Sequence, residues 1–269
     1  MQIGADEALA QTAVSALTAQ LVLAPKPGLP DPRDLAGAAG GRDHGTLRWS
    51  AKALAPGLAA MAAAARRTGE PTAELRAELG AIGRCAEHTV GLAGGGHRGA
   101  LWTLGLLVAA AALTPEGSPE DIALTAKRIV AHPDRRAPRS PSRGSTVSAT
   151  YGAAGARGEA RAGFPHVRRA LTALAAARAS GASEGDARMD ALLTVMSTLQ
   201  DTELLHTAGP RGLRHVQSGA RAVLDAGGTA TPAGRTALTT LDTDLTARSL
   251  SPRGTAPLLS GALFLDTRR

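Results

Sequence analysis

The longest apolar run in the sequence, residues 99–113, constrains the fold more than any other segment. It is interrupted by glycine and is shorter than the roughly 20 residues that a membrane-spanning helix needs. Because the run is apolar on every side, it predicts a helix buried in the core of the protein. We therefore expect no contact with a membrane.

The core around this helix has few aromatic side chains to fill it. Hydrophobic residues make up 43% of the 269 residues, but aromatic residues only 2%. Alanine, leucine and valine must therefore build most of the core, and this composition favours closely packed helices. A chain of this length can form one large domain or two small ones. We expect a single all-α domain over residues 1–269, built as a multi-helix bundle.

Apolar residues recur at helical spacing along most of the chain, and no segment shows the convincing alternation of a strand. The clearest helix start is at Ser118, an N-cap residue followed by Pro119 and by acidic side chains that favour the helix dipole. Besides residues 99–113, the predicted helices cover residues 5–23, 47–67, 72–90, 118–130, 159–179, 184–206, 211–224, 233–247 and 255–265.

One long connection, residues 131–158, is rich in proline and arginine. This length is unusual for a structureless connection inside a compact domain, so it predicts either a lid over a site or a disordered loop. Its arginines would suit closure over a phosphate group.

The charge of the chain indicates an anionic partner. The formal net charge is +7 and the sequence pI is about 10.8, which suits either nucleic acid or a phosphorylated small molecule. The scarcity of aromatics argues against stacking on single strands, and dispersed arginines are typical of solvated helix faces. We therefore expect a small-molecule substrate and no nucleic acid.

The single cysteine, Cys85, excludes an internal disulfide and a cysteine-only metal cage. The first residues carry acidic Asp6 and Glu7 and lack a basic region followed by an apolar core, which argues against a secretory signal. We expect a cytoplasmic protein. The oligomeric state is left open, with a homodimer as one option.

A short proline-framed segment, Pro-Lys-Pro-Gly-Leu at residues 25–29, follows the first predicted helix. Its prolines fix the backbone and Gly28 allows a turn, so Lys26 and the nearby Asp31 are held at little entropic cost. The segment is either a ligand loop or an ordinary helix-ending turn with a solvated lysine.

A glycine-rich loop leads directly into the apolar helix. Gly94, Gly95 and Gly96 expose backbone N–H groups, and the following helix start carries partial positive charge. The loop could therefore cradle phosphate, with Arg98 assisting. It is neither a Walker motif nor a dinucleotide fingerprint.

Two further segments could carry chemistry. Arg157 and Glu159 flank Gly158 at a predicted helix start, either as functional groups or as a surface ion pair beside helix caps. Asp201 and Thr202 lie inside a predicted helix, where such a pair has poor propensity, and this indicates a buried polar role.

Taken together and in this order, these motifs resemble the triphosphoribosyl-dephospho-CoA synthase family, whose members make the prosthetic-group precursor of citrate lyase and malonate decarboxylase. Gly-Phe-Pro at residues 163–165 and Leu-Ser-Pro at residues 250–252 with Gly254 extend the resemblance nearly end to end. The resemblance implies an all-α transferase. It would use ATP and 3′-dephospho-CoA to make 2′-(5″-triphosphoribosyl)-3′-dephospho-CoA and adenine.

The resemblance also implies roles for individual residues. Such a reaction needs cations, backbone N–H groups and Mg²⁺ around the triphosphate, and carboxylates for metal or proton work. The phosphate-binding candidates are Lys26, Gly94, Gly95, Gly96, Arg98 and Arg157. The catalytic candidates are Asp31, Asp43, Glu159, Asp201 and His97, and the metal candidates are Asp31, Asp43 and Asp201.

The sequence also departs from the family pattern. Residue Ala39 stands where the family has histidine, Asp43 is the one acid kept in that motif, and residues 142–145 lack another histidine and another acid. His44 could substitute for a missing histidine, or could be a solvent-exposed loop residue. Three hypotheses remain open: the family reaction, a nucleotide-dependent transferase with a different acceptor, and a non-catalytic helical binding protein.

Overall fold

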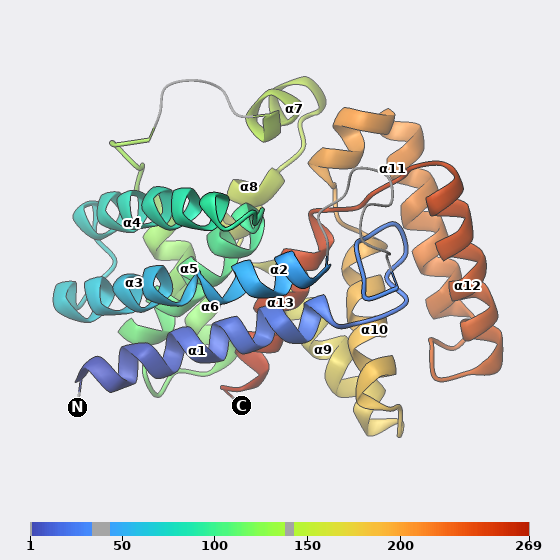
Figure 1. The fold of residues 1–269 in the computed structure, drawn as a ribbon, viewed down its shortest axis with the longest axis horizontal. Helices are drawn as coiled ribbons and strands as arrows, with labels where there is room; N and C mark the ends of the chain where they lie inside the picture. Colours follow the sequence, from blue (N-terminus) through green and yellow to red (C-terminus); the bar gives the residue numbers. More distant parts are fainter. Residues whose placement is uncertain (1, 34–43, 138–142, 269) are drawn as a thin grey trace.

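The computed structural model describes residues 2–33, 44–137 and 143–268. Within these ranges the ordered elements are all helices and there is no strand, which confirms the all-α class (Figure 1). The helices are α1 (Gln2–Leu21), α2 (His44–Lys52), α3 (Ala55–Thr68), α4 (Ala73–Leu92), α5 (Arg98–Leu113), α6 (Pro119–Ala131), α7 (Arg143–Tyr151), α8 (Gly155–Arg161), α9 (Pro165–Ala179), α10 (Glu184–Met196), α11 (Thr202–Asp225), α12 (Pro232–Ala247) and α13 (Thr255–Asp266).

Helix α5 is the predicted core helix. Its side chains from Ala100 to Ala112 are buried, apart from a partly buried Trp102, and it packs against α1, α3, α4, α6, α8 and α13. Small residues allow this close packing, since a Cβ at Gly105 would lie 2.6 Å from the sulfur of Met61 on α3. None of the helices in the ranges described has the length and apolarity that crossing a membrane requires.

A second group of helices extends the fold on the other side of α13. Helix α10 packs against α9, α11 and α13, and α11 pairs with α12 in the long hairpin on the right of Figure 1. Buried hydrophobic side chains from both groups belong to one continuous cluster. Alanine, leucine and valine supply most of it, and Phe164 and Phe264 are fully buried within it.

Several predicted helices agree with the structure within a few residues, among them α4, α6, α12 and α13. At the start of α6, the Ser118 hydroxyl accepts a hydrogen bond from the backbone N–H of Asp121. The Asp121 carboxylate in turn accepts one from the Ser118 backbone, which completes a capping box.

Three predicted helices are each divided in two. Two of the divisions come just before a proline, since Pro56 and Pro165 lie in the first turns of α3 and α9. Proline lacks the N–H that a helix interior requires but is tolerated in a first turn, so a new helix begins there. The third division is made by Asp201, whose side chain accepts from Glu203 N and so caps the start of α11. The prediction that Asp201 lies inside a helix is therefore wrong. Within α11, Gly209 has a non-helical φ of +63° and is followed by Pro210, so the predicted break between residues 206 and 211 is confirmed.

The prediction of a long loop over residues 131–158 is also wrong for much of its length. Helix α7 and the first turn of α8 lie inside that range. Residues 132–137 are held against α4 and the segment before it, since His132 contacts the Pro71 carbonyl at 2.9 Å and Arg84 donates to Asp134 at 2.8 Å. The part of the predicted lid at residues 138–142 lies outside the described residues.

Candidate active site

The proline-framed segment packs on the loop before α13. Gly28 has a φ of +67°, and a Cβ there would lie 2.2 Å from the backbone oxygen of Leu250 and 3.1 Å from Pro252. Only glycine permits both this backbone conformation and this close approach. The contact joins two motifs that are more than 200 residues apart in the sequence.

Lys26 is buried, with a relative exposure of 1%, so the alternative of a solvated lysine is wrong. Its Nζ donates to the carbonyls of Gln20 and Leu21, each at 3.2 Å, at the C-terminal end of α1 where the helix dipole favours a cation. His44 Nε2 lies 2.9 Å from the same Leu21 carbonyl. His44 is half-buried and contacts the end of α1, so the alternative of a solvent-exposed loop histidine is wrong.

Asp31 is equally buried and is surrounded by donors. Its carboxylate accepts from the backbone N–H of Lys26 at 2.9 Å, and from the backbone and guanidinium of Arg33 at 2.8 Å and 2.6 Å. Arg33 also donates to Asp242 on α12 at 2.8 Å. Burial favours a higher pKa for Asp31, but the hydrogen bonds and charge of Arg33 and the Lys26 N–H outweigh it and lower that pKa. Asp31 is therefore held ionised.

Asp201 is 1% exposed, which confirms the buried polar role. One carboxylate oxygen accepts from the backbone of Glu203 at 2.8 Å and of Leu204 at 3.2 Å, and the other accepts from Gly254 N at 2.7 Å. Burial nonetheless raises the pKa of Asp201. The carboxylate thus ties the start of α11 to the start of α13.

Glu159 is buried on α8 and is paired with a histidine that the sequence analysis missed. Its two oxygens contact His166 N at 2.8 Å and His166 Nδ1 at 2.7 Å, across a bend where Phe164 has a φ of +53°. The alternative of a surface ion pair between Arg157 and Glu159 is therefore wrong, because Glu159 is buried and paired with His166. His166 Nε2 is buried and has no hydrogen-bond partner among the described residues. Its place directly after the Gly-Phe-Pro motif was the available signal.

The glycine loop connects α4 to α5 and borders a cavity of about 230 Å³. His97 is 7% exposed, and its Nε2 lies 3.0 Å from Ser50 Oγ and 2.9 Å from the Leu47 carbonyl. Arg98 is exposed and its Nε lies 3.4 Å from Glu87. The residues lining the cavity are Leu54, Glu87, Val90, Gly91, Gly95, Gly96, His97, Arg98 and Leu101.

The starts of several helices meet where these motifs converge. A Cβ at Gly99 on α5 would lie 2.8 Å from Pro257 on α13, and one at Gly155 on α8 would lie 3.6 Å from Thr202 on α11. The side chains of the N-cap residues do not cap α5 or α13, although the Asp201 carboxylate accepts from Gly254 N at the start of α13. The first N–H groups of α5 therefore carry partial positive charge. This arrangement favours an anionic ligand.

The predicted metal ligands do not form a metal site in the described part of the chain. No three His, Cys, Asp or Glu side chains are grouped there so that they could hold an ion. The carboxylates of Asp31 and Asp201 each bind N–H donors through both oxygens, so they do not fit a resident Mg²⁺. The third predicted ligand, Asp43, lies outside the described residues.

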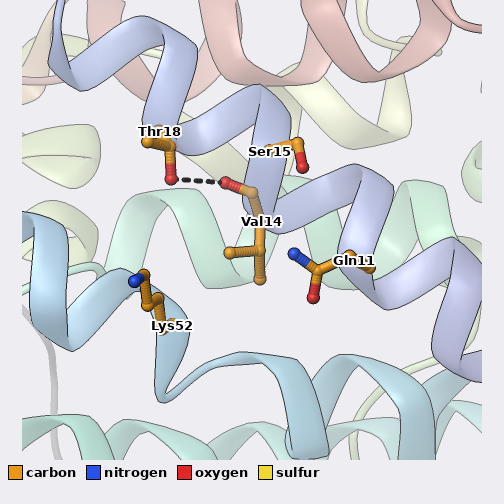
Figure 2. Close-up of a pocket in the computed structure, with 5 residues that line it drawn as sticks. All are labelled: Gln11, Val14, Ser15, Thr18 and Lys52. Carbon is orange, nitrogen blue, oxygen red and sulfur yellow. Dashed lines mark hydrogen bonds between the residues drawn. The ribbon is translucent and has the colours of Figure 1, made fainter.

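A larger cavity, of about 480 Å³, lies between α1 and the end of α2. Figure 2 shows its lining side chains, with Thr18 donating to the Val14 carbonyl at 2.9 Å and Lys52 on the opposite side. Its lining consists of Gln11, Val14, Ser15, Thr18 and Lys52. None of the predicted site residues lines it.

Comparisons with known proteins agree with the motif order. The family model described as ATP:dephospho-CoA triphosphoribosyl transferase matches residues 6–269. A protein of Azotobacter vinelandii, "Probable 2-(5''-triphosphoribosyl)-3'-dephosphocoenzyme-A synthase", is 47% identical over 266 residues, which cover 97% of this chain and 91% of that protein. A protein of the same name from Pseudomonas fluorescens is 48% identical over 97% of this chain and 91% of its own length.

No solved structure matches the chain. The family match nevertheless covers almost the whole sequence, and the motifs that carry the resemblance meet in the tertiary structure around Asp201, Gly254 and the glycine loop. The chain therefore belongs to the ATP:dephospho-CoA triphosphoribosyl transferase family.

Proposed function

We propose that this protein transfers the triphosphoribosyl group of ATP to 3′-dephospho-CoA and releases adenine. The observation that carries the proposal is the hydrogen bond between Asp201 and Gly254, together with the contact of Gly28 on Leu250. These contacts bring family motifs from both ends of the chain to one place, beside the start of α5, which has no side-chain cap.

The reaction has a simple balance of bonds. The 2′-hydroxyl oxygen of dephospho-CoA bonds to the anomeric carbon of the ATP ribose, the bond from that carbon to adenine breaks, and the hydroxyl proton is transferred in the overall balance to adenine. Positive charge develops on the sugar during the exchange, by analogy with glycoside cleavage. A buried carboxylate near that carbon would stabilise the charge.

The triphosphate requires positive charge and N–H donors. The N-terminus of α5 supplies both, and exposed Arg98 and Arg157 can reach a ligand from the protein surface. Lys26 adds a buried cation in the loop that packs on Leu250, where the low polarity strengthens its attraction for an anion. Magnesium enters this proposal as the counter-ion of ATP.

The carboxylates and histidines have separate roles in charge stabilisation and positioning. Asp31, which is held ionised, is suited to stabilising positive charge, whereas Asp201, whose pKa burial raises, positions the starts of α11 and α13 through its backbone hydrogen bonds. Glu159 orients His166 through Nδ1 and leaves Nε2 for a further partner. His97 is positioned by Leu47 and Ser50 at the glycine loop. Because both substrates are metabolites of the cytoplasm, the proposal also implies a cytoplasmic protein.

The direct test is to incubate the protein with ATP, Mg²⁺ and 3′-dephospho-CoA and to measure free adenine by chromatography and the acceptor product by mass spectrometry. We expect adenine and a triphosphoribosyl adduct in equal amounts, and neither without dephospho-CoA. Adenine without consumption of dephospho-CoA would instead indicate a different acceptor. No adenine and no nucleotide-dependent rise in Tm would indicate a protein that does not use ATP.

A further inference from the structure

Helix α4 presents two arginines along one face, outside the motifs described above. Arg76, Gly80 and Arg84 are spaced four residues apart and therefore lie above one another. Asp134, from the segment after α6, lies over Gly80, where a Cβ would be 2.1 Å from the carboxylate. Arg84 Nη1 donates to Asp134 at 2.8 Å, while Arg76 Nη1 is 3.8 Å from the same oxygen. One carboxylate thus serves two guanidinium groups.

These contacts leave a hydrogen-bond donor of Arg76 without a partner among the described residues. Arg76 is 6% exposed, and its Nε is buried without a hydrogen-bond partner among the described residues. Its guanidinium carbon lies 5.3 Å from the ring centroid of Trp102, a cation–π contact. A buried guanidinium with so few hydrogen bonds is costly unless a further anion is bound.

A third arginine approaches from α8. Trp102 Nε1 donates to the Ala156 carbonyl at 3.2 Å, which holds the first turn of α8 beside α5. Arg157 is the next residue, and its charge repels Arg76. Burial is the largest cause that lowers the pKa of Arg76, and the charges of Arg157 and Arg84 lower it further.

The balance of charge in this arginine cluster (Arg76, Arg84 and Arg157) is positive. Two guanidinium groups, those of Arg76 and Arg84, share the one carboxylate of Asp134, and Arg157 is near enough for its charge to repel Arg76. Arg157 is exposed and the Arg84 side chain is 35% exposed, so a ligand can reach the cluster from solvent. Several guanidinium forks match the multiple acceptor oxygens of a phosphate group better than they match one carboxylate.

We propose that the arginine cluster binds a phosphate group of a phosphoanhydride chain, either the triphosphate of ATP or the diphosphate of dephospho-CoA. Asp134 orients Arg84, Trp102 supports Arg76, and Arg157 closes the site from α8. This assignment rests on the proposed function for the choice between the two substrates. The binding of a phosphoanhydride itself does not depend on catalysis.

The experiment uses the full chain and inorganic pyrophosphate as the probe. Affinity is measured by calorimetry in the wild type, Arg84→Gln and Arg157→Gln, with Arg67→Gln as the control. Arg67 is an exposed arginine on α3 that is paired with Glu78. We expect the Kd for pyrophosphate to rise by roughly 10-fold or more in each cluster variant, which is typical of a lost charged hydrogen bond. The control should keep the wild-type Kd. Circular dichroism verifies folding, and Arg157→Gln serves as the second variant because Arg157 is exposed.

The location of the probe is read from Trp102. The other tryptophan, Trp49, is 64% exposed and can be replaced in a Trp49→Phe background. Pyrophosphate should change the Trp102 emission in that background, and the change should be lost in Arg84→Gln. The KM of the cluster variants is then compared with that of the wild type. A higher KM for ATP alone, or for dephospho-CoA alone, identifies which substrate supplies the phosphate.

Two results separate this proposal from the proposed function. Equal pyrophosphate affinity in the wild type and in the folded cluster variants would overturn the phosphate site, even if adenine is released. Weaker pyrophosphate binding in the cluster variants, together with no adenine release by the wild type, would support the phosphate site and contradict the transferase activity.

Discussion

The carboxylate of Asp201 accepts a 2.7 Å hydrogen bond from the backbone N–H of Gly254, which lies 53 residues later in the chain. The other carboxylate oxygen caps α11 through Glu203 and Leu204. A Cβ at position 254 would lie 2.9 Å from this carboxylate, so the contact also requires glycine there. One side chain therefore sets the relative positions of the starts of α11 and α13.

Asp201→Asn is expected to destabilise the fold by about 1–3 kcal/mol, because the amide nitrogen cannot accept a hydrogen bond and one backbone donor stays buried without a partner. Urea unfolding measures the change in the free energy of unfolding. The control is Glu116→Gln, at an exposed acid. Equal stability of the two variants would show that the Asp201 contacts contribute little.

Gly28→Ala is expected to destabilise the protein more than Gly69→Ala. Both glycines have positive φ, +67° and +78°, but a Cβ at Gly28 would meet the Leu250 oxygen, whereas nothing lies within 4 Å of one at Gly69. The backbone cost of roughly 1–2 kcal/mol is common to both variants. The steric clash should add about 1–3 kcal/mol at Gly28 alone. Thermal unfolding of the two variants gives the difference, and equal Tm values would contradict the close packing of Gly28 on Leu250.

The contribution of Asp31 to stability is expected to depend on pH with a defined sign. The pKa of Asp31 is lowered in the folded protein, so its stabilisation is fully present above the unfolded-state pKa of about 3.9 and is lost as pH falls through the lower folded value. The free energy of unfolding is measured against pH for the wild type and Asp31→Asn. The two curves should differ above pH 4 and converge in more acidic solution. Divergence on acidification would contradict this assignment.

Lys26→Met is expected to raise the KM for ATP by about 10-fold or more, because it removes a charged donor while filling the same volume. Adenine release against ATP concentration measures the effect. Lys127→Met, at an exposed lysine on α6, is the control and should resemble the wild type. If the folded Lys26→Met enzyme kept its KM, Lys26 would be a structural cation at the end of α1 and would have no role in ATP binding.

Much of the secondary structure could be predicted from local sequence. Residues 99–113 are apolar on every face and become the buried α5, and Ser118 with Asp121 forms the capping box of α6. The divisions between helices were harder to predict. The apolar periodicity of residues 184–206 continues through a break at which Asp201 caps α11 and also binds Gly254 N on a distant segment.

The contacts of the site residues could not be predicted from the local sequence either. Local spacing placed Glu159 beside Arg157, but a bend with positive φ at Phe164 turns α9 back so that His166 meets Glu159. The long connection was predicted as a lid or a disordered loop, and its sequence did not indicate that Asp134 contacts the arginines of α4.

The sequence by itself determined the helical class, the buried central helix and the family motifs, because periodicity and motif order are local properties of the chain. Only the tertiary structure decided which groups those motifs contact. Asp201 became the cap that joins α11 to α13, and Lys26 became a buried cation at the end of α1. The physical reason is that a buried polar group must find a partner, and that partner is supplied by whichever distant segment the packing of the helices brings within hydrogen-bond distance.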